Sequence, residues 1–378
     1  MKIMKNLKSI ICYDPVLFIT LIVACISALF VSPSLEYFTY IDFHVLSLLL
    51  MMMLVVAGMQ KVGLFSFIVA SLLKLVHTTR MLAFVLMNVC FFSSMLITND
   101  VALLTFVPLG IMMLIQTQKE RLLIPIIVLQ TIAANLGSML TPLGNPQNLY
   151  LYSISSMDIG NFLKVMVVPS TLSFLILSAS VFFIKSEKIV PFSEKQDVVI
   201  KRKKVIPWCG LFVICLLAVL RVIPHNLAFI TVLICVIMID KRVLFRADYA
   251  LLLTFIFLFI FIGNIKNIPE ISSALSKLVE GRELTVGILL SQIISNVPAA
   301  MLLSKFTDNY ATLLLGVNLG GLGTLIASMA SVISYKLYAT TEKAQTGKYL
   351  AVFTAVNFVF LTILWSVTAF QLQFRFFV

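Results

Sequence analysis

The chain consists of long apolar segments separated by short clusters of charged, glycine and proline residues. A helix of about 20 apolar residues crosses the hydrocarbon core of a bilayer, which is about 30 Å thick. The pattern therefore predicts an all-α polytopic membrane protein. Simple spans are predicted at 12–31, 42–59, 62–77, 162–184, 206–222, 226–240, 249–265 and 349–370.

The apolar block 81–116 is too long for one span. As a single helix it would extend about 54 Å, at about 1.5 Å per residue. Its middle, Ile97-Thr98-Asn99-Asp100-Val101, is polar. We expect a re-entrant helical hairpin with this polar tip enclosed by protein or lining a cavity, because irregular backbone is not tolerated against lipid.

The block 122–153 contains residues that interrupt a helix. It includes Asn135-Leu136-Gly137-Ser138, followed by Thr141-Pro142-Leu143-Gly144-Asn145-Pro146-Gln147-Asn148. Proline removes a helical hydrogen bond, and glycine weakens a helix by about 1 kcal/mol. We therefore predict a discontinuous helix, with two half-helices joined by unwound backbone near the middle of the membrane.

Both features recur in the second half of the chain. Ser295-Asn296-Val297-Pro298 resembles the first hairpin tip, and Asn318-Leu319-Gly320-Gly321 resembles the first break. Residue 318 follows residue 135 by 183 positions, and Thr324 follows Thr141 by the same spacing. Residue 295 follows residue 98 by 197 positions. Two matches in the same order predict an internal repeat.

Each predicted repeat has five spanning segments, one of them discontinuous, and one re-entrant hairpin. Five crossings are an odd number, so two tandem copies face opposite ways, as in many transporters with broken helices. The first inverted repeat covers 1–185, with its hairpin at about 81–116 and its broken helix at about 122–153. A basic linker covers 186–205, and the second repeat covers 206–378, with a hairpin at about 271–308 and a broken helix at about 310–335.

Composition supports a membrane protein and argues against a soluble one. Hydrophobic residues make up 61% of the chain and charged residues 12%, whereas soluble domains contain about 25% charged residues. The net charge of +12 is unevenly spread, and basic residues cluster in 185–204. Between two apolar halves this favours a cytoplasmic loop over a nucleic-acid-binding segment, because basic loops resist translocation. Lys2, Lys5 and Lys8 would then lie outside, against the same rule, so the orientation of the N-terminus stays open.

Asp100 is the only ionisable residue from 81 to 118. A carboxylate at membrane depth costs at least about 2.5–3.5 kcal/mol, so such groups usually have a function. We expect it to bind a coupling cation, Na⁺ or H⁺. The alternatives are a hairpin tip that reaches water and a simple cap of the second hairpin arm.

Neutral polar residues, Ser328 among them, gather at the four breaks. Their amides and hydroxyls, with freed backbone carbonyls, can replace the water shell of Na⁺, and the N-termini of half-helices can hold an anion without arginine. The segments 122–157 and 309–335 contain no charged residue. The alternative is that these groups only join helices to one another. The predicted substrate-binding residues are Thr98, Asn99, Asn135, Gly137, Thr141, Asn145, Asn148, Ser295, Asn296, Asn318, Gly320 and Thr324; the predicted coupling-ion residues are Asp100, Asn99 and Asn296.

The sequence lacks the usual signatures of enzymes. No G-x-x-x-x-G-K-[ST] loop for nucleotides occurs, and Asp100 has no second carboxylate in its break region, as a paired aspartyl site requires. We expect no catalytic residue, and no cofactor or metal apart from Na⁺ or H⁺ as coupling ion. An intramembrane enzyme or a non-transporting receptor is the alternative from another class.

Four segments in order resemble the ion transporter superfamily, which includes arsenite permeases, divalent anion/Na⁺ symporters, citrate–metal transporters and Na⁺/H⁺ antiporters. They are ITNDVALLTFVPL, ANLGSMLTPLGNPQNL, SQIISNVPAAMLL and GVNLGGLGTLIASMASVISYKLY. The resemblance implies two inverted repeats, a homodimer, and elevator-type movement of the substrate. In the Na⁺/dicarboxylate branch the tips are Ser-Asn-Thr; here Asp100 and Val297 occupy the third positions, and Asp100 would repel a dicarboxylate. The Asn-Asp tip is more similar to that of the arsenite permeases.

We therefore predict a secondary transporter of a small anion or oxyanion in the cell membrane, coupled to Na⁺ or H⁺. The alternative is an exporter of arsenite or Na⁺ that works by proton exchange. The expected partners are the substrate, the lipid bilayer and a second copy of the chain, with no nucleic acid.

Overall fold

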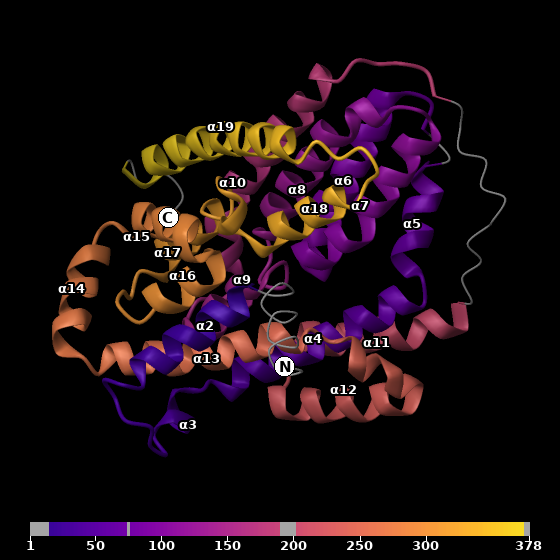
Figure 1. The fold of residues 1–378 in the computed structure, drawn as a ribbon. Helices are drawn as coiled ribbons and strands as arrows, with labels where there is room; N and C mark the ends of the chain where they lie inside the picture. The colour runs from indigo at the N-terminus through magenta and orange to yellow at the C-terminus, as the bar shows by residue number, and fades with distance from the viewer. Residues whose placement is uncertain (1–14, 74–75, 190–201, 374–378) are drawn as a thin grey trace, which may run out of the picture. The chain divides into compact units, whose positions relative to one another are not determined.

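The computed structural model describes residues 15–73, 76–189 and 202–373 (Figure 1). The start of the first predicted span, the three N-terminal lysines and most of the basic linker lie outside these ranges. All regular elements in them are helices, and the only β-pairing is an isolated bridge between Thr78 and Lys188. The predicted all-helical class is confirmed.

Seven helical segments of the described residues are long and apolar enough to cross a membrane. This confirms the polytopic membrane architecture that the apolar runs predict. The segments are Phe43–Lys61, Thr79–Ile97, Asn99–Gln116, Glu120–Ser138, Ile159–Phe183, Tyr249–Lys266 and Thr346–Gln373.

The chain forms two compact units, and each draws on both halves of the sequence. Unit 1 comprises Met1–Gly58, Pro207–Arg282 and Met301–Asp308. Unit 2 comprises Met59–Ile206, Glu283–Ala300 and Asn309–Val378. The units thus cut across the two predicted repeats, and the inverted orientation of the repeats stays a prediction.

Unit 1 is built around the packing of its first helix on α13. Asn264 of α13 donates hydrogen bonds from Nδ2 to Ser27 Oγ and Tyr37 Oη, both at 3.0 Å. Gly263 leaves room for the Tyr40 ring, which would lie 2.2 Å from a Cβ at that position. The helices are α2 (Pro15–Ser27), α3 (Tyr37–Tyr40), most of α4 (Phe43–Lys61), most of α11 (Arg202–Val219), α12 (His225–Asp240), η3 (Lys241–Arg246), α13 (Tyr249–Lys266), α14 (Pro269–Val279) and the end of α16 (Asn296–Leu303).

Unit 2 contains the first predicted hairpin, the tip of the second and both predicted broken helices. From the first half of the chain it takes α5 (Leu64–Leu73), α6 (Thr79–Ile97), α7 (Asn99–Gln116), η1 (Glu120–Leu122), α8 (Leu123–Ser138), α9 (Pro146–Ile154), α10 (Ile159–Ser180) and η2 (Val181–Phe183). From the second half it takes α15 (Glu283–Ile294), the start of α16 (Asn296–Leu303), α17 (Tyr310–Leu319), η4 (Leu325–Ala327), α18 (Met329–Ala339) and α19 (Thr346–Gln373).

Helix α8 lies at the centre of unit 2, where it packs against α6, α7 and α18 (Figure 1). In the most apolar part of the segment Glu120–Ser138, 83% is buried in protein, against 28% in the most apolar part of α19. An apolar helix with most of its surface uncovered by protein needs lipid around it. We infer that α19 faces the bilayer and that most of α8 is shielded from it.

The helices end where the sequence predicts breaks. Only Thr98 separates α6 from α7, and only Ser295 separates α15 from α16. Helix α8 ends at Ser138, and α9 begins at Pro146 with Asn145 as its N-cap. Helix α17 ends at Leu319, and α18 begins at Met329. With 19 and 18 residues, α6 and α7 are each long enough to cross the membrane; that both enter from one side stays a prediction.

The second hairpin occupies part of its predicted range. Its helices run from 283 to 303, and residues 269–279 form the separate helix α14 of unit 1. Gly281, with φ at 70°, lies in the turn between α14 and α15. Glycine adopts this left-handed backbone at no steric cost.

Candidate functional site

The first hairpin tip is bound to the first helix break. Thr98 has φ at 70°, a left-handed conformation that costs a β-branched residue energy unless its surroundings hold it. Asn99 next to it is buried, and its Nδ2 donates to Asn135 Oδ1 at 3.0 Å. The backbone N–H of Asn99 donates to the carbonyl of Gly144 at 3.0 Å. The tip is therefore held by both sides of the break between α8 and α9.

The second tip has the same local structure. Ser295 has φ at 75°, and its hydroxyl donates to the carbonyl of Ala327 at 3.4 Å. Asn296 is buried with its amide beside Gly321, where a Cβ would lie only 2.9 Å from Nδ2. The left-handed residues Thr98 and Ser295 occupy positions that the predicted repeat pairs.

Asn135 is bound by residues from the other half of the chain. Its Oδ1 accepts a hydrogen bond from Ser328 Oγ at 3.0 Å, besides the one from Asn99. Its Nδ2 donates to the carbonyl of Gly321 and to Ser331 Oγ, both at 3.4 Å. A buried amide with partners on both its oxygen and its nitrogen is held in one orientation.

Asn318 is bound in the matching way by the first half. Its Oδ1 accepts from Asn145 Nδ2 at 3.0 Å, and its Nδ2 donates to Asn148 Oδ1 at 2.6 Å and to the carbonyl of Leu314 at 2.8 Å. Ser138 joins the two groups, since it accepts from Asn145 Nδ2 at 3.1 Å and donates to the carbonyl of Asn135 at 2.8 Å.

These contacts form a crosswise pattern. Asn145 and Ser328 each donate to the asparagine of the opposite half, and Asn148 and Ser331 each accept from it. Residue 328 follows residue 145, and residue 331 follows residue 148, by the 183 positions that separate Asn318 from Asn135. Likewise Thr141 donates to the carbonyl of Met95, and Thr324 donates to the carbonyl of Gln292. We call these buried groups the crosswise amide network; its core is Asn99, Asn135, Ser138, Asn145, Asn148, Asn318, Ser328 and Ser331.

The predicted glycines let helices approach one another closely. A Cβ on Gly137 would lie 2.1 Å from the carbonyl oxygen of Phe91 in α6, and one on Gly320 would lie 2.6 Å from Ser291 Oγ in α15. Each glycine brings a broken helix against the first arm of a hairpin. They therefore position the network, and their predicted role in contacting substrate stays a prediction.

Gly137→Ala is expected to lower the stability of the protein. The added methyl group overlaps the backbone of α6, and overpacking of this kind costs about 1–3 kcal/mol. Thermal unfolding of the detergent-solubilised protein measures the effect. Gly347→Ala is the matched control, because no atom lies within 4 Å of a Cβ at that position. Equal unfolding temperatures for the two variants would contradict the close approach of α8 to α6.

Asp100 lies in the first turn of α7, where the partial positive charge of the helix N-terminus stabilises a carboxylate. The side chain is half-buried, and its backbone N–H donates to Asn99 Oδ1 at 3.0 Å. The position thus places a negative charge directly beside the crosswise amide network. A charge here is compatible with both predicted roles, a cation site and a helix cap.

The sequence analysis missed three polar groups of the site. Gln292 donates from Nε2 to the carbonyls of Gly320 and Leu322, both at 2.9 Å, and accepts from the backbone N–H of Thr324 at 2.9 Å. Ser138 and Ser331 were also missed. The 183-residue spacing from Asn148 would have identified Ser331, whereas Gln292 has an apolar counterpart, Met95, and no such signal.

Four helix N-termini meet at the network. Asn99 and Asn296 are the first residues of α7 and α16, and Asn145 and Ser328 are the N-caps of α9 and α18. Unpaired N–H groups of a first helical turn attract anions, and carbonyls at the ends of α8 and α17 attract cations. Interrupted helices that bring such ends together inside a membrane-spanning unit are typical of secondary transporters.

The fold and the site thus define a membrane transporter with discontinuous helices. Residues 14–334 match the citrate transporter family, CitMHS, and the chain belongs to this family. It is similar to a protein of Methanocaldococcus jannaschii that is named an uncharacterized transporter, with 32% identity over 332 residues, 87% of this chain and 90% of the relative. It is also similar to the inner membrane protein YbiR of Escherichia coli, with 29% identity over 304 residues, 79% of this chain and 80% of the relative. A 46 kDa membrane protein of Mycobacterium leprae is 26% identical over 346 residues, 79% of each chain.

Proposed function

We propose that this transporter moves a small anion or oxyanion, coupled to Na⁺ or H⁺, and that the substrate binds at the crosswise amide network. The observation that carries the proposal is the meeting of four helix N-termini where the surrounding segments, 122–157 and 309–335, contain no charged residue. Helix ends and amide N–H groups attract an anion there. The same groups are neutral, so the site can release its ligand.

A coupling cation would bind beside the anion. Asp100, with Asn99 and Asn296 close to the tips, supplies oxygen ligands of the kind that Na⁺ accepts, and the carboxylate is also able to carry a proton. A cation here would offset the repulsion between Asp100 and an anionic substrate. This makes binding of the two ions interdependent, which is the requirement for coupling.

We further propose elevator-type alternating access by a homodimer in the cell membrane, as the resemblance to the ion transporter superfamily implies. The whole candidate site lies within unit 2, which favours movement of the site as one body. The name of the relative YbiR as an inner membrane protein supports the location. That all relatives named above are called transporters or membrane proteins supports the expectation that the chain is no enzyme.

Flux into proteoliposomes tests the proposal. The panel contains citrate, succinate, sulfate, phosphate and arsenite, each with and without an inward Na⁺ or H⁺ gradient. We expect uptake of one anion to rise at least about tenfold with one of the gradients. Uptake that ignores both gradients would refute coupling.

The alternative is export of arsenite or Na⁺ by proton exchange, which the Asn-Asp tip favours. A deletion strain separates the two functions. Sensitivity of the deletion strain to arsenite or to Na⁺, with tolerance restored by the wild-type gene, would support export. Unchanged tolerance of both would leave anion uptake as the function.

A further inference from the structure

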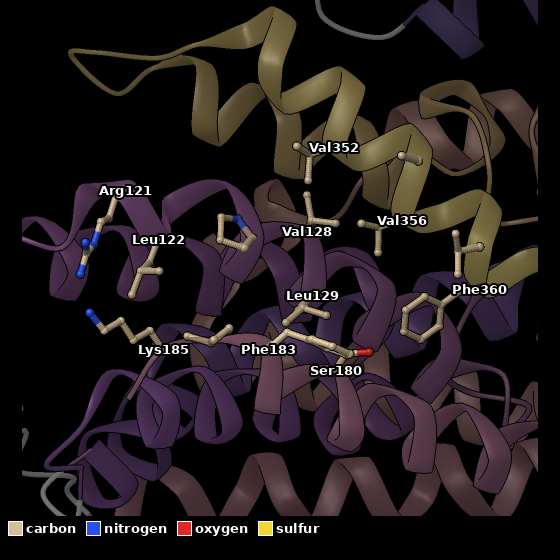
Figure 2. A pocket seen from close by; sticks show the side chains of 14 residues that line it. Arg121, Leu122, Val128, Leu129, Ser180, Phe183, Lys185, Val352, Val356 and Phe360 are labelled. Atoms are coloured by element: carbon tan, nitrogen blue, oxygen red, sulfur yellow. The ribbon is translucent and has the colours of Figure 1, made fainter. Parts of the chain in front are cut away.

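A groove of about 650 Å³ lies within unit 2, between the first half of α8, the end of α10 and α19 (Figure 2). This volume is in the range of sites for drug-sized ligands. Its walls are apolar, formed by residues such as Pro125, Val128, Leu129, Val356 and Phe360. It lies apart from the crosswise amide network, and the proposed function does not use it.

The groove has a charged end and an apolar end. Figure 2 shows Arg121 and Lys185 at one end and Phe360 at the other. The side chains of Arg121 and Lys185 are 62% and 82% exposed. Arg121 precedes the first turn of α8, and Lys185 follows the end of α10, so both lie where these helices leave the membrane. The basic end is therefore at the level of the lipid headgroups.

Glu187 orders the basic end without neutralising it. Its carboxylate pairs with Arg121, with Lys119 at 2.8 Å and with Lys185 at 3.9 Å. Hydrogen bonds from Lys119 and Arg121 lower the pKa of Glu187 to about 2, so the carboxylate is charged at neutral pH. Three cations face one anion, so the basic end of the groove keeps a net positive charge. The Arg121 guanidinium also has further N–H donors for another acceptor.

The interior of the groove accepts only an apolar occupant. Beyond the basic end, Ser180 is the one polar side chain among the described residues of the wall. Its hydroxyl already donates to the carbonyl of Ile176 at 2.8 Å. Water needs two to four polar partners and would find none on these walls. The exposed side chains of Phe183 and Val359 continue the groove onto the outer surface, so the occupant comes from the bilayer.

We propose that this groove is a binding site for an anionic phospholipid of the surrounding membrane. The phosphate lies against Arg121 and Lys185, and one acyl chain follows α8 and α19 towards Phe360. From Val352 to Phe360 the wall extends about 12 Å along α19, which suits an acyl chain lying parallel to the helix. Basic pockets between membrane helices bind anionic headgroups. The net positive charge at the basic end of the groove disfavours a zwitterionic lipid, whose headgroup carries its own cationic group.

Native mass spectrometry of the full-length protein in detergent tests the proposal. The probes are dioleoyl phosphatidylglycerol, dioleoyl phosphatidylcholine with the same chains, and glycerol 3-phosphate without chains. We expect the first bound molecule of phosphatidylglycerol to bind about tenfold more tightly than the first bound molecule of phosphatidylcholine. Equal binding of the two lipids would overturn the proposal. Binding of glycerol 3-phosphate as tight as that of the lipid would also overturn it, since the site would then be one for free phosphate.

Four variants locate the site. Arg121→Gln with Lys185→Gln is expected to abolish the preference for phosphatidylglycerol, while Glu187→Gln is expected to strengthen it by removing the competing carboxylate. Lys241→Gln with Lys277→Gln is the matched control, because these exposed lysines belong to unit 1, whereas the groove lies within unit 2. Val356→Trp fills the groove and should weaken the binding of both lipids. An unchanged preference in the Arg121 and Lys185 variant would refute the site, even if Val356→Trp failed to fold.

Discussion

Asn318→Ala is expected to reduce transport at least tenfold while the protein still inserts into the membrane. Without this amide, Asn145 Nδ2 keeps only Ser138 Oγ as an acceptor and Asn148 Oδ1 loses its donor, both in a buried place. Each unsatisfied buried group costs about 1–3 kcal/mol, and 1.4 kcal/mol corresponds to a factor of ten. Initial rates of substrate uptake in proteoliposomes, normalised to inserted protein, measure the loss.

Two companion variants sharpen this experiment. Asn318→Asp keeps the acceptor oxygens but loses the donor to Asn148 and to the carbonyl of Leu314, so it should also fail to transport. Asn161→Ala removes an exposed asparagine of unit 2 and should transport normally. Full transport by Asn318→Ala would show that the crosswise amide network has only a structural role, or none.

Asp100→Asn is expected to uncouple transport from its driving ion. The replacement keeps the shape of the side chain and its place in the first turn of α7, but it removes the only ionisable group from 81 to 118. The ratio of uptake with and without the Na⁺ or H⁺ gradient should fall to about one. Flux assays at fixed substrate concentration, with each gradient applied in turn, give this ratio.

Asp158→Asn is the control for the charge itself. Asp158 caps α10 by accepting from the backbone N–H of Asn161 at 2.9 Å, and asparagine caps helices about as well as aspartate. Coupling should be unchanged in this variant. If Asp100→Asn kept its full response to the gradient, the carboxylate would be a helix cap and the coupling ion would bind elsewhere.

The sequence predicted the helix breaks because their causes are local. Clustered proline and glycine residues weaken a helix locally, so the ends of α8 and α17 near Gly137 and Gly320 follow from the residues themselves. Single prolines, such as Pro108 in α7 and Pro169 in α10, lie inside continuous helices. The left-handed backbone at Thr98 and Ser295 was not predictable, since neither residue favours it. Tertiary contacts impose it, through the bonds that hold each tip.

The partners of the buried amides also lay beyond sequence reasoning. Asn135 and Asn318 were predicted as site residues, but their bonds join positions far apart in the chain, such as Asn145 with Asn318. Gln292 was missed because a single glutamine in an apolar helix is compatible with simple helix packing. The two units were not predicted either, because apolar runs identify membrane helices but not which of them pack together.

The crosswise bonding has a consequence for fragments of the chain. Each half supplies the donors and acceptors that the asparagine of the other half requires, as Asn145 does for Asn318 and Ser328 for Asn135. A polypeptide cut between residues 190 and 201 would therefore yield two pieces, each with polar groups that only its counterpart satisfies. Co-expressed, such pieces should reassemble into a working carrier, whereas either piece alone should be degraded.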